Sequence, residues 1–286
     1  MPHRADGHAT GRATLAFVRA LIAFVLLLAA GCTTGGTGAT DATPATATSA
    51  AVLRVDVLQK LPHDPKAFTQ GFELADGVLY EGTGLEGRSS VRAVDPATGH
   101  VNRQVDLPPH LFGEGITVVG DSIWQITWQD GVAILRDRRT LAEKKRVDYD
   151  GEGWGICHDQ HRLIMSDGSD HLTFRNTGTF AVEGGVDVRA GDQPVNRINE
   201  LECVTGQDGR VQVWANIWQT DQIVRIDPAN GHVTATVDLS GLLPAADRAG
   251  ADVLNGIAHV PGTDEFLVTG KLWPTMFRVR FVTSAP

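Results

Sequence analysis

An all-β fold is predicted for this chain by three observations. First, short segments that alternate apolar and polar residues recur from Val52 onward, as in half-buried strands. Second, no segment after Val52 has the 3.6-residue apolar period that marks an amphipathic helix. Third, these segments come in a loosely repeated unit of about 40–50 residues, with three or four strands in each unit.

Each unit opens with a turn that contains glycine or asparagine and leads into a short apolar strand. The five openings lie at residues 68–72, 113–117, 153–157, 199–203 and 255–259. A second strand follows a polar turn in every unit, and these strands begin near Gly77, Ser122, Arg162, Val211 and Glu265. In two units the third strand leads into the turn Asp-Pro-Ala-x-Gly-His, at 95–100 and 227–232, which is hairpin turn chemistry.

Repeats of this length, with three or four strands each, are typical of a β-propeller in which every repeat is one blade. The five openings therefore predict five blades. The last unit stops after its third strand, at Phe281, and a lone strand at 51–59 precedes the first unit. We expect this N-terminal strand to complete the last blade and close the ring, which removes two exposed sheet edges. A β-sandwich is the alternative, but it does not explain the regular spacing of the openings.

The length and charge of the chain narrow the range of functions. A chain of 286 residues can bury a full core, but it is too short for two large domains with linkers. The formal net charge of −9 argues against nucleic acid and anionic membrane surfaces as partners, and it mildly favours cationic groups such as peptide amino termini. Cys157 and Cys203 could pair in an oxidising compartment or stay as buried thiols.

The first residues have the features of an export signal. Basic residues precede an apolar run at 20–30, which ends at Gly31 and Cys32. This run is shorter than the ~20 residues that a membrane-spanning helix needs. The sequence Ala-Ala-Gly-Cys resembles a bacterial lipoprotein box, which would make Cys32 the lipidated first residue of the mature protein. The alternative is an ordinary secreted protein with a cysteine near its cleavage site.

The expected organisation has three parts. A lipoprotein-type signal occupies 1–32, a flexible tether without large apolar side chains occupies 33–51, and the propeller occupies 52–286. We therefore expect an exported protein of the periplasm or cell envelope, which contacts the membrane only through a lipid on Cys32. The protein is expected to be a monomer.

Glu114 is the first candidate for chemistry. It lies between two glycines, which let the backbone bend and hold the carboxylate at the mouth of a strand. Phe112 lies two residues away, on the same face of an extended segment, and an apolar neighbour raises the pKa of a carboxylate by excluding water. Alone, a Gly-Glu-Gly turn would indicate only a solvated glutamate. Because equivalent turns of a propeller converge at one end of its channel, the recurring turns favour a shared pocket.

Several tryptophans lie close to these turns. Trp128, Trp154 and Trp218 are candidates for the pocket, whereas Trp124 and Trp214 begin second strands and are assigned to the core. Tryptophan is large, and blades of a propeller pack on one another through aromatic side chains, so the core assignment applies wherever no turn is near.

Other polar residues receive different predictions. Glu200 and Glu202 share one face of a strand and are expected to form ion pairs with neighbouring loops. Asp167 and Asp170 are expected to be turn residues. Lys271 follows a glycine at the same part of its unit as two of the pocket tryptophans, which favours a place in the pocket.

No motif for a metal or nucleotide accompanies these residues. The chain has no CxxC pair, no HExxH, no phosphate-binding loop of the Gly-x-x-x-x-Gly-Lys type and no GxSxG elbow. Its ten histidines are scattered without the spacing of metal ligands. We therefore expect neither a metal nor a cofactor.

Nine segments of the body carry a family resemblance when they are taken in order. They lie at 62–71, 112–117, 126–128, 152–155, 163–170, 199–202, 214–218, 254–258 and 269–274. Among them are Phe-Gly-Glu-Gly-Ile-Thr, Asn-Glu-Leu-Glu and Thr-Gly-Lys-Leu-Trp-Pro. The chain resembles the glutamine cyclotransferase (glutaminyl-peptide cyclotransferase) family of plants and bacteria from Leu53 to Phe281, with departures at 82–87 and at Cys203. The resemblance implies a five-bladed propeller, which agrees with the number of repeats.

The resemblance also implies an activity. The enzyme would convert the amino-terminal glutamine of a peptide or protein into pyroglutamate and release ammonia, because the α-amine attacks the amide of its own side chain. We expect Glu114 to shuttle the proton, while Asn199 and Lys271 would polarise the amide oxygen. The substrate would lie in a box formed by Phe68, Gln70, Phe112, Trp128, Trp154 and Trp218.

Three other functions are compatible with parts of the sequence. Tryptophan rings and paired carboxylates also suit a propeller that binds or cleaves glycans. A non-enzymatic envelope propeller that binds partners would use the same rings without chemistry. A metal-dependent, lactonase-like propeller would need several carboxylates at the centre of the channel, where Glu114 is the one that we predict.

Overall fold

The structure is a computed structural model that describes residues 49–283. The predicted signal at 1–32, the lipidation of Cys32 and nearly all of the tether at 33–51 lie outside the described residues. The described part is an all-β protein, as predicted, and its one helical element is the short 3₁₀ helix η1 (Ala245–Asp247). Nowhere in residues 49–283 is there a helix long and apolar enough to cross a membrane.

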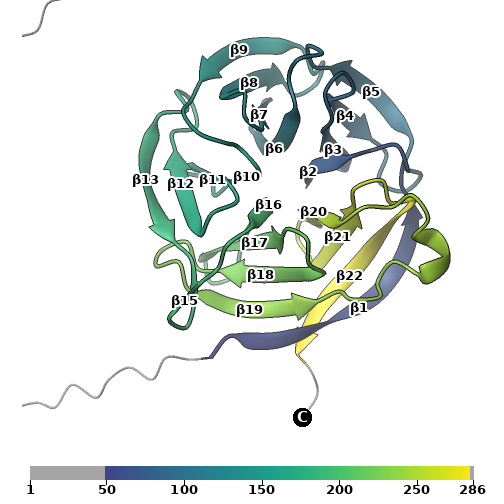
Figure 1. The fold of residues 1–286 in the computed structure, drawn as a ribbon, viewed down its shortest axis with the longest axis vertical. Helices are drawn as coiled ribbons and strands as arrows, with labels where there is room; N and C mark the ends of the chain where they lie inside the picture. Colours follow the sequence, from purple (N-terminus) through teal and green to yellow (C-terminus); the bar gives the residue numbers. More distant parts are fainter. Residues whose placement is uncertain (1–48, 284–286) are drawn as a thin grey trace, which may run out of the picture. The chain divides into compact units, whose positions relative to one another are not determined.

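Four-stranded antiparallel sheets make up the first part of the fold, and their first strands lie innermost around a central axis (Figure 1). The first sheet contains β2 (Thr69–Ala75), β3 (Val78–Thr83), β4 (Ser90–Val94) and β5 (Val101–Asp106). The second contains β6 (Gly113–Val119), β7 (Ser122–Thr127), β8 (Val132–Asp137) and β9 (Glu143–Asp148). The third contains β10 (Ile156–His158), β11 (Leu163–Ser166), β12 (His171–Arg175) and β13 (Val182–Asp187).

An eight-stranded sheet makes up the rest of the fold. Its strands in chain order are β1 (Ala51–Pro62), β16 (Ile198–Thr205), β17 (Val211–Ile217), β18 (Gln222–Ile226), β19 (Val233–Asp238), β20 (Leu254–His259), β21 (Glu265–Gly270) and β22 (Thr275–Thr283). Their spatial order is β16-β17-β18-β19-β1-β22-β21-β20. A small hairpin of β14 (Arg189–Ala190) and β15 (Gln193–Pro194) lies between β13 and β16 in the chain.

The position of β1 unites the two ends of the described chain. It runs antiparallel to β22, from Leu53 opposite Thr283 to Pro62 opposite Thr275, and parallel to β19 from Ala51 to Arg54. Figure 1 shows β1 far from the central axis, beside both the last strand β22 and β19. The hydrogen bonds of the N-terminal strand are therefore made with strands that follow it by more than a hundred residues.

The core lies between neighbouring sheets, because each sheet presents alternate side chains to the next one. Trp124 and Trp214 are both buried there, as predicted. Cys157 in β10 and Cys203 in β16 form a disulfide with their Cα atoms 5.4 Å apart. Of the two states that the sequence left open, the structure therefore shows the paired one, and this bond joins two innermost strands of different sheets.

The innermost strands share an irregularity that the sequence did not predict. Four of them shift register near their first residues, between Thr69 and Gly71, Gly113 and Ile116, Ile198 and Leu201, and Leu254 and Ile257. A bulge of this kind turns a side chain out of the regular alternation. Gln70, Glu114 and Asn199 all lie within these bulges, so the same backbone device positions three predicted pocket residues.

Glycines let the innermost strands approach one another closely. A Cβ atom on Gly115 would lie 2.8 Å from the backbone nitrogen of Ile156, and one on Gly155 would lie 2.1 Å from the carbonyl oxygen of Asn199. A side chain at either position would push neighbouring strands apart. The glycine after Glu114 thus has a packing role, in addition to the flexibility expected from the sequence.

The prediction that Glu200 and Glu202 form ion pairs is wrong. Both side chains are buried, and no ion pair involves them in the part of the chain that the structure describes. Glu200 instead accepts backbone hydrogen bonds from Phe72 (3.2 Å) and Ile257 (2.8 Å), and Glu202 accepts one from His259 (2.8 Å). Burial raises the pKa of both carboxyls well above the usual value. They connect the innermost strands to one another through backbone amides.

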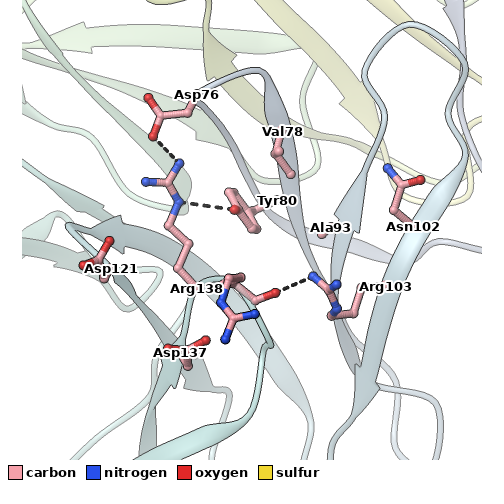
Figure 2. A pocket seen from close by; sticks show the side chains of 10 residues that line it. Asp76, Val78, Tyr80, Ala93, Asn102, Arg103, Asp121, Asp137 and Arg138 are labelled. Atoms are coloured by element: carbon pink, nitrogen blue, oxygen red, sulfur yellow. Dashed lines mark hydrogen bonds and ion pairs between the residues drawn. The ribbon is translucent and has the colours of Figure 1, made fainter.

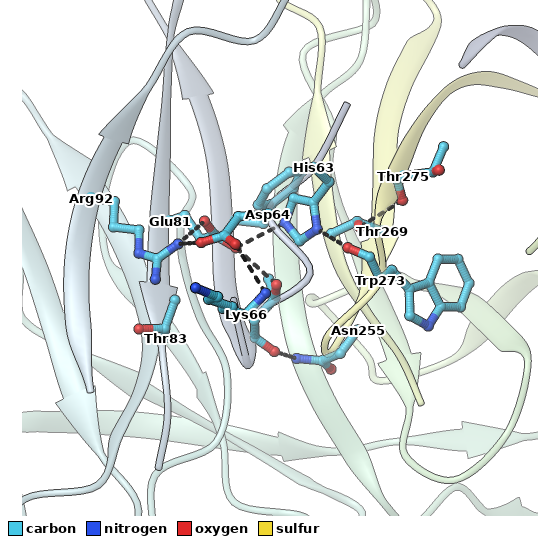
Figure 3. Close-up of polar contacts among 12 residues, drawn as sticks. His63, Asp64, Lys66, Glu81, Thr83, Arg92, Asn255, Thr269, Trp273 and Thr275 are labelled. Atoms are coloured by element: carbon cyan, nitrogen blue, oxygen red, sulfur yellow. Dashed lines mark hydrogen bonds and ion pairs between the residues drawn. The ribbon is translucent and has the colours of Figure 1, made fainter. Parts of the chain in front are cut away.

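A buried polar network fixes the segment that leads into β2 (Figure 3). His63 contacts Glu81 (3.0 Å) and the carbonyl oxygen of Trp273 (2.7 Å), while Thr69 donates to Glu81 (2.8 Å). Burial alone would lower the pKa of His63, but the Glu81 carboxylate, the Trp273 carbonyl and Asp64 together outweigh burial and raise it. The network therefore ties the start of the first sheet to the loop after β21, which carries Lys271.

Candidate active site

One cavity of about 380 Å³ brings together all nine side chains that the sequence assigned to the pocket. They are Phe68, Gln70, Phe112, Glu114, Trp128, Trp154, Asn199, Trp218 and Lys271. These residues come from the turns and bulges at the starts of innermost strands and from the loops after second strands. Side chains separated by as many as 203 positions in the sequence therefore meet in one place.

Glu114 lines this cavity and is 5% exposed. Its Oε1 atom accepts a hydrogen bond of 2.8 Å from Nε2 of Gln70, whereas Oε2 is buried without a hydrogen-bond partner. Burial raises the pKa of Glu114 well above its usual value. The positive charge of Lys271 opposes this rise, and the negative charge of Glu152 adds to it. A carboxyl with one free oxygen and a raised pKa is suited to exchange a proton with a bound molecule.

Lys271 is the cation of the cavity and is also 5% exposed. Its Nζ atom lies 4.8 Å from the centre of the Phe68 ring, a cation–π distance. Burial lowers the pKa of Lys271, while Glu114 and Asp252 oppose this change. Two backbone hydrogen bonds, from Asp252 to Lys271 (2.8 Å) and from Lys271 to Val253 (2.9 Å), hold the residue in place.

Asn199 supplies a second polar group. The side chain is buried, and its Oδ1 atom has no hydrogen-bond partner. Its backbone is fixed by Ser166, whose hydroxyl donates to the Asn199 carbonyl at 2.6 Å. Gln70 is held from the other side, because Asn255 donates to its Oε1 atom at 3.5 Å and to the carbonyl of Thr69 at 3.0 Å.

Aromatic rings form the wall around these polar groups. The ring of Phe112 lies edge-on to Phe68 (6.2 Å between centroids) and to Trp128 (5.6 Å), and Trp154 lies edge-on to Trp218 (5.3 Å). Contacts of this geometry stabilise aromatic clusters. Trp128 is 37% exposed and marks the rim, whereas Phe68, Phe112 and Trp154 are more enclosed. The wall excludes water from one side of the polar residues.

The sequence did not predict four further lining residues, Leu85, Gln219, Asp252 and Val253. Leu85 and Gln219 adopt positive φ angles of 85° and 61°, which the residue types do not indicate. Asp252 and Val253 end a long connection between β19 and β20 that has no repeat counterpart. The backbone pairing of this connection with Lys271 could not be read from the repeat.

A second, larger depression of about 600 Å³ lies elsewhere, beside β3 and β4 (Figure 2). There Arg138 donates to Asp76 (2.7 Å) and to the hydroxyl of Tyr80 (3.2 Å), and Arg103 donates to the carbonyl of Arg139. None of the nine predicted site residues lines it. None of the described residues that line this depression has a buried polar side-chain atom without a hydrogen-bond partner, whereas Glu114 and Asn199 in the other cavity do.

Metal binding is not indicated by the geometry. Within residues 49–283, no group of three or more histidine, cysteine, aspartate or glutamate side chains is placed to hold a metal ion. The cavity brings together a desolvated carboxyl, an amine and an amide in an aromatic enclosure.

These features define an all-β, propeller-like protein whose central cavity contains a buried carboxyl, an amide and an amine. Comparison with known proteins agrees: the family model described as glutamine cyclotransferase matches residues 26–281. The chain is 38% identical over 238 residues to glutaminyl-peptide cyclotransferase of Arabidopsis thaliana, which covers 81% of this chain and 72% of that protein. This chain therefore belongs to the glutamine cyclotransferase family.

A solved structure supports the same assignment. The fold is similar to the crystal structure of Myxococcus xanthus glutaminyl cyclase, with a TM-score of 0.75 and 33% sequence identity. The match covers 82% of this chain and all of that one. The family resemblance and the β-propeller-like fold that the sequence indicated are thus both confirmed at this level.

Proposed function

We propose that this protein converts the amino-terminal glutamine of peptides or proteins into pyroglutamate and releases ammonia. The observation that carries the proposal is the meeting of Glu114, Asn199 and Lys271 in one aromatic cavity of a chain that belongs to the glutamine cyclotransferase family. The names of the Arabidopsis and Myxococcus relatives support the same reaction. The glycan and scaffold alternatives have no comparable support.

The cavity supplies what the cyclisation needs. The reaction joins two groups of the same residue, so the protein must fold the glutamine side chain back toward its own α-amine and need not bring two molecules together. The aromatic wall can enclose the methylene groups of the side chain. Lys271 and Asn199 line the same cavity and would donate hydrogen bonds to the amide oxygen, whose negative charge grows as the amine attacks.

Glu114 is proposed to carry the proton. The α-amine nitrogen forms a bond to the side-chain amide carbon and loses a proton to the free Oε2 atom of Glu114. The same carboxyl then gives this proton to the amide nitrogen, the carbon–nitrogen bond breaks, and ammonia leaves. No net proton is consumed by the protein. An α-amine has a pKa near ~8, so a carboxyl with a raised pKa is a closer match than an ordinary one.

A substrate panel tests the proposed reaction. The purified protein should release ammonia from a Gln-initiated peptide, and the same peptide with an acetylated α-amine should be inert because its nitrogen cannot attack. Ammonia can be measured with a coupled assay, and an oligosaccharide panel should be run beside it. Hydrolysis of an oligosaccharide without ammonia release from the free peptide would replace this proposal with a glycan-active one.

Replacing Lys271 tests the polarising role. Lys271→Met keeps most of the side-chain volume but removes the donor, and loss of one such donor lowers kcat by roughly 10²–10³-fold. Lys60→Met is the matched control, because Lys60 also lies over a phenylalanine ring, that of Phe277 at 6.0 Å, but on the outer strand β1. Equal kcat values for the two variants, measured by ammonia release, would exclude Lys271 from the reaction.

We also propose that the fold has five blades and that β1 closes the last one. Three blades would be the four-stranded sheets, the fourth would be β16–β19, and the fifth would be β20–β22 with β1 as its outer strand. The antiparallel pairing of β1 with β22 supports this division of the eight-stranded sheet. The parallel contact of β1 with β19 would then link the fourth and fifth blades.

Export is a further part of the proposal. We infer that residues 1–32 direct the protein to the periplasm or envelope and that Cys32 receives a lipid. The disulfide between Cys157 and Cys203 supports an oxidising location, since thiols stay reduced in most cytosolic proteins. Replacing Cys32 by serine should release the protein from the membrane fraction if the lipid is its anchor.

A further inference from the structure

Glu152 lies on the connection between β9 and β10 and contacts residues that line the cavity, although the sequence alone indicated no role for it. Its carboxylate accepts three side-chain hydrogen bonds. Oε2 accepts from Nε1 of Trp128 and from Nε1 of Trp154, both at 2.9 Å, and Oε1 accepts from Nε2 of Gln129 at 2.7 Å. Two of the three donors are pocket tryptophans: Trp128 directly follows β7 of the second sheet, and Trp154 lies just before β10 of the third.

These hydrogen bonds connect two parts of the aromatic wall that make no ring contact with each other in the described part of the chain. Ring contacts run from Phe68 through Phe112 to Trp128, and a separate contact joins Trp154 to Trp218. No ring contact joins Trp128 to Trp154 among the described residues. The single oxygen that accepts from both indoles therefore connects the two parts of the wall. An indole has only one donor, so losing this acceptor frees each ring to rotate away from the cavity.

The bonds also keep Glu152 ionised. Hydrogen bonds from Trp154, Gln129 and Trp128 lower the pKa of its carboxyl, so the group carries a full negative charge at neutral pH. Hydrogen bonds to an ionised acceptor are stronger than those to a neutral one. The charge acts on the interior as well, since it raises the pKa of Glu114 in opposition to Lys271.

We propose that Glu152 is a positioning residue of the glutamine pocket, which holds the indoles of Trp128 and Trp154 in the wall and places a negative charge on that wall. This inference rests on the proposed function for its kinetic consequences, but the positions of the two indoles do not depend on it. Glu152 acts on the substrate through these neighbours.

Two substitutions separate the two effects. Glu152→Gln keeps an oxygen that can accept from the indoles and removes the charge, whereas Glu152→Ala removes both. Asp150→Asn is the matched control, because Asp150 is an exposed carboxylate two positions away that takes no part in the pocket. We expect KM for a Gln-initiated peptide to rise about tenfold in Glu152→Ala, as loss of strong hydrogen bonds at a binding wall implies, and much less in Glu152→Gln.

The pH profile of kcat tests whether the negative charge of Glu152 acts on Glu114. The charged groups that act on Glu114 are Lys271, which lowers its pKa, and Glu152, which raises it. Because the Glu152 charge raises the pKa of Glu114, its removal should lower that pKa. Glu114 must be ionised to take the proton, so the acid limb of the kcat profile should move to lower pH in Glu152→Gln and Glu152→Ala, but not in Asp150→Asn.

Indole N–H signals test the structural part without any assay of activity. The chain has six tryptophans, and a nitrogen–proton correlation spectrum resolves one indole signal for each. The signals of Trp128 and Trp154, assigned with single phenylalanine variants, should shift strongly in Glu152→Ala and weakly in Asp150→Asn. Unchanged signals for both residues in Glu152→Ala would overturn the proposal, and so would KM and pH profiles equal to those of Asp150→Asn. If the wild type released no ammonia, the proposed function would fall, while the indole signals would still decide whether Glu152 positions the two rings.

Discussion

Glu114→Gln is expected to lower kcat for ammonia release from a Gln-initiated peptide by about 10³-fold, the range that loss of a general acid–base group produces. The substituted amide has nearly the same shape, and it can still accept the hydrogen bond that Gln70 donates to Oε1 at 2.8 Å. It cannot take a proton from the α-amine. KM should therefore change little while kcat collapses, which is the pattern of a group that acts in the transition state.

Although Glu114→Gln should lower kcat, it should not lower the stability of the folded protein. The pKa of Glu114 is raised in the folded protein, so between its unfolded and folded pKa values the folded state binds more protons and stability falls as the pH rises. A neutral amide avoids burying a charge at alkaline pH. Glu114→Gln should consequently be at least as stable as the wild type at pH 8, as measured by thermal unfolding. Glu86→Gln, which changes an exposed glutamate, is the control for both measurements.

The pH dependence of wild-type activity follows from the same raised pKa of Glu114. Activity needs the ionised carboxylate, so it should be lost as the pH falls through the raised pKa of Glu114 rather than near the ordinary value for glutamate. A kcat profile that stays flat down to the ordinary glutamate pKa, or near-normal turnover by Glu114→Gln, would exclude Glu114 as the proton carrier.

Removal of the disulfide between Cys157 and Cys203 should strongly lower the free energy of unfolding. Cys157 and Cys203 are separated by 46 positions. In the chain-entropy model, a cross-link that closes a loop of this length stabilises the folded state by about 4 kcal/mol. The double variant Cys157→Ala/Cys203→Ala should therefore unfold at a clearly lower urea concentration. Alanine is the better replacement here because Cys157 is buried, where serine would need a hydrogen-bond partner.

Reduction gives an independent test of the same bond. Unfolding curves of the wild type in the presence of a reductant should approach those of the double variant, and the reductant should leave the double variant unchanged. Equal stability of the oxidised wild type and the double variant would show that the bond does not stabilise this fold.

Local sequence predicted the strands and the pocket because both depend on features that repeat. The turn-and-strand openings at Gly113 and Asn199 recur at a spacing that is typical of a radial arrangement. Once the openings are placed around one axis, Glu114, Asn199 and Lys271 must converge, even though Glu114 and Lys271 are 157 positions apart. Chain periodicity therefore carries information about contacts over long distances in sequence.

Other parts of the site depend on contacts that leave no local signal. The bulges at Gln70 and Glu114 arise from how β2 and β6 pair with their neighbours, and the sequence of either strand alone does not specify the shift. Glu200 was expected to pair with a cation, but it faces backbone amides of β2 and β20, which have no sequence signature. The contacts of Glu152 leave no sequence signal for a similar reason, because its partners are the indole nitrogens of Trp128 and Trp154, which the sequence indicated only as aromatic rings.

The central claim is geometric: the glutamine side chain lies inside the cavity with its α-amine at Glu114 and its amide oxygen toward Lys271 and Asn199. A crystal structure of Glu114→Gln with a Gln-initiated peptide tests it most directly, because the slow variant should hold the substrate intact. We expect the α-amine within hydrogen-bond distance of the side chain at position 114 and the amide oxygen within reach of Lys271 or Asn199. A peptide bound with its amino terminus outside this cavity, or with its amide turned away from both donors, would contradict the account.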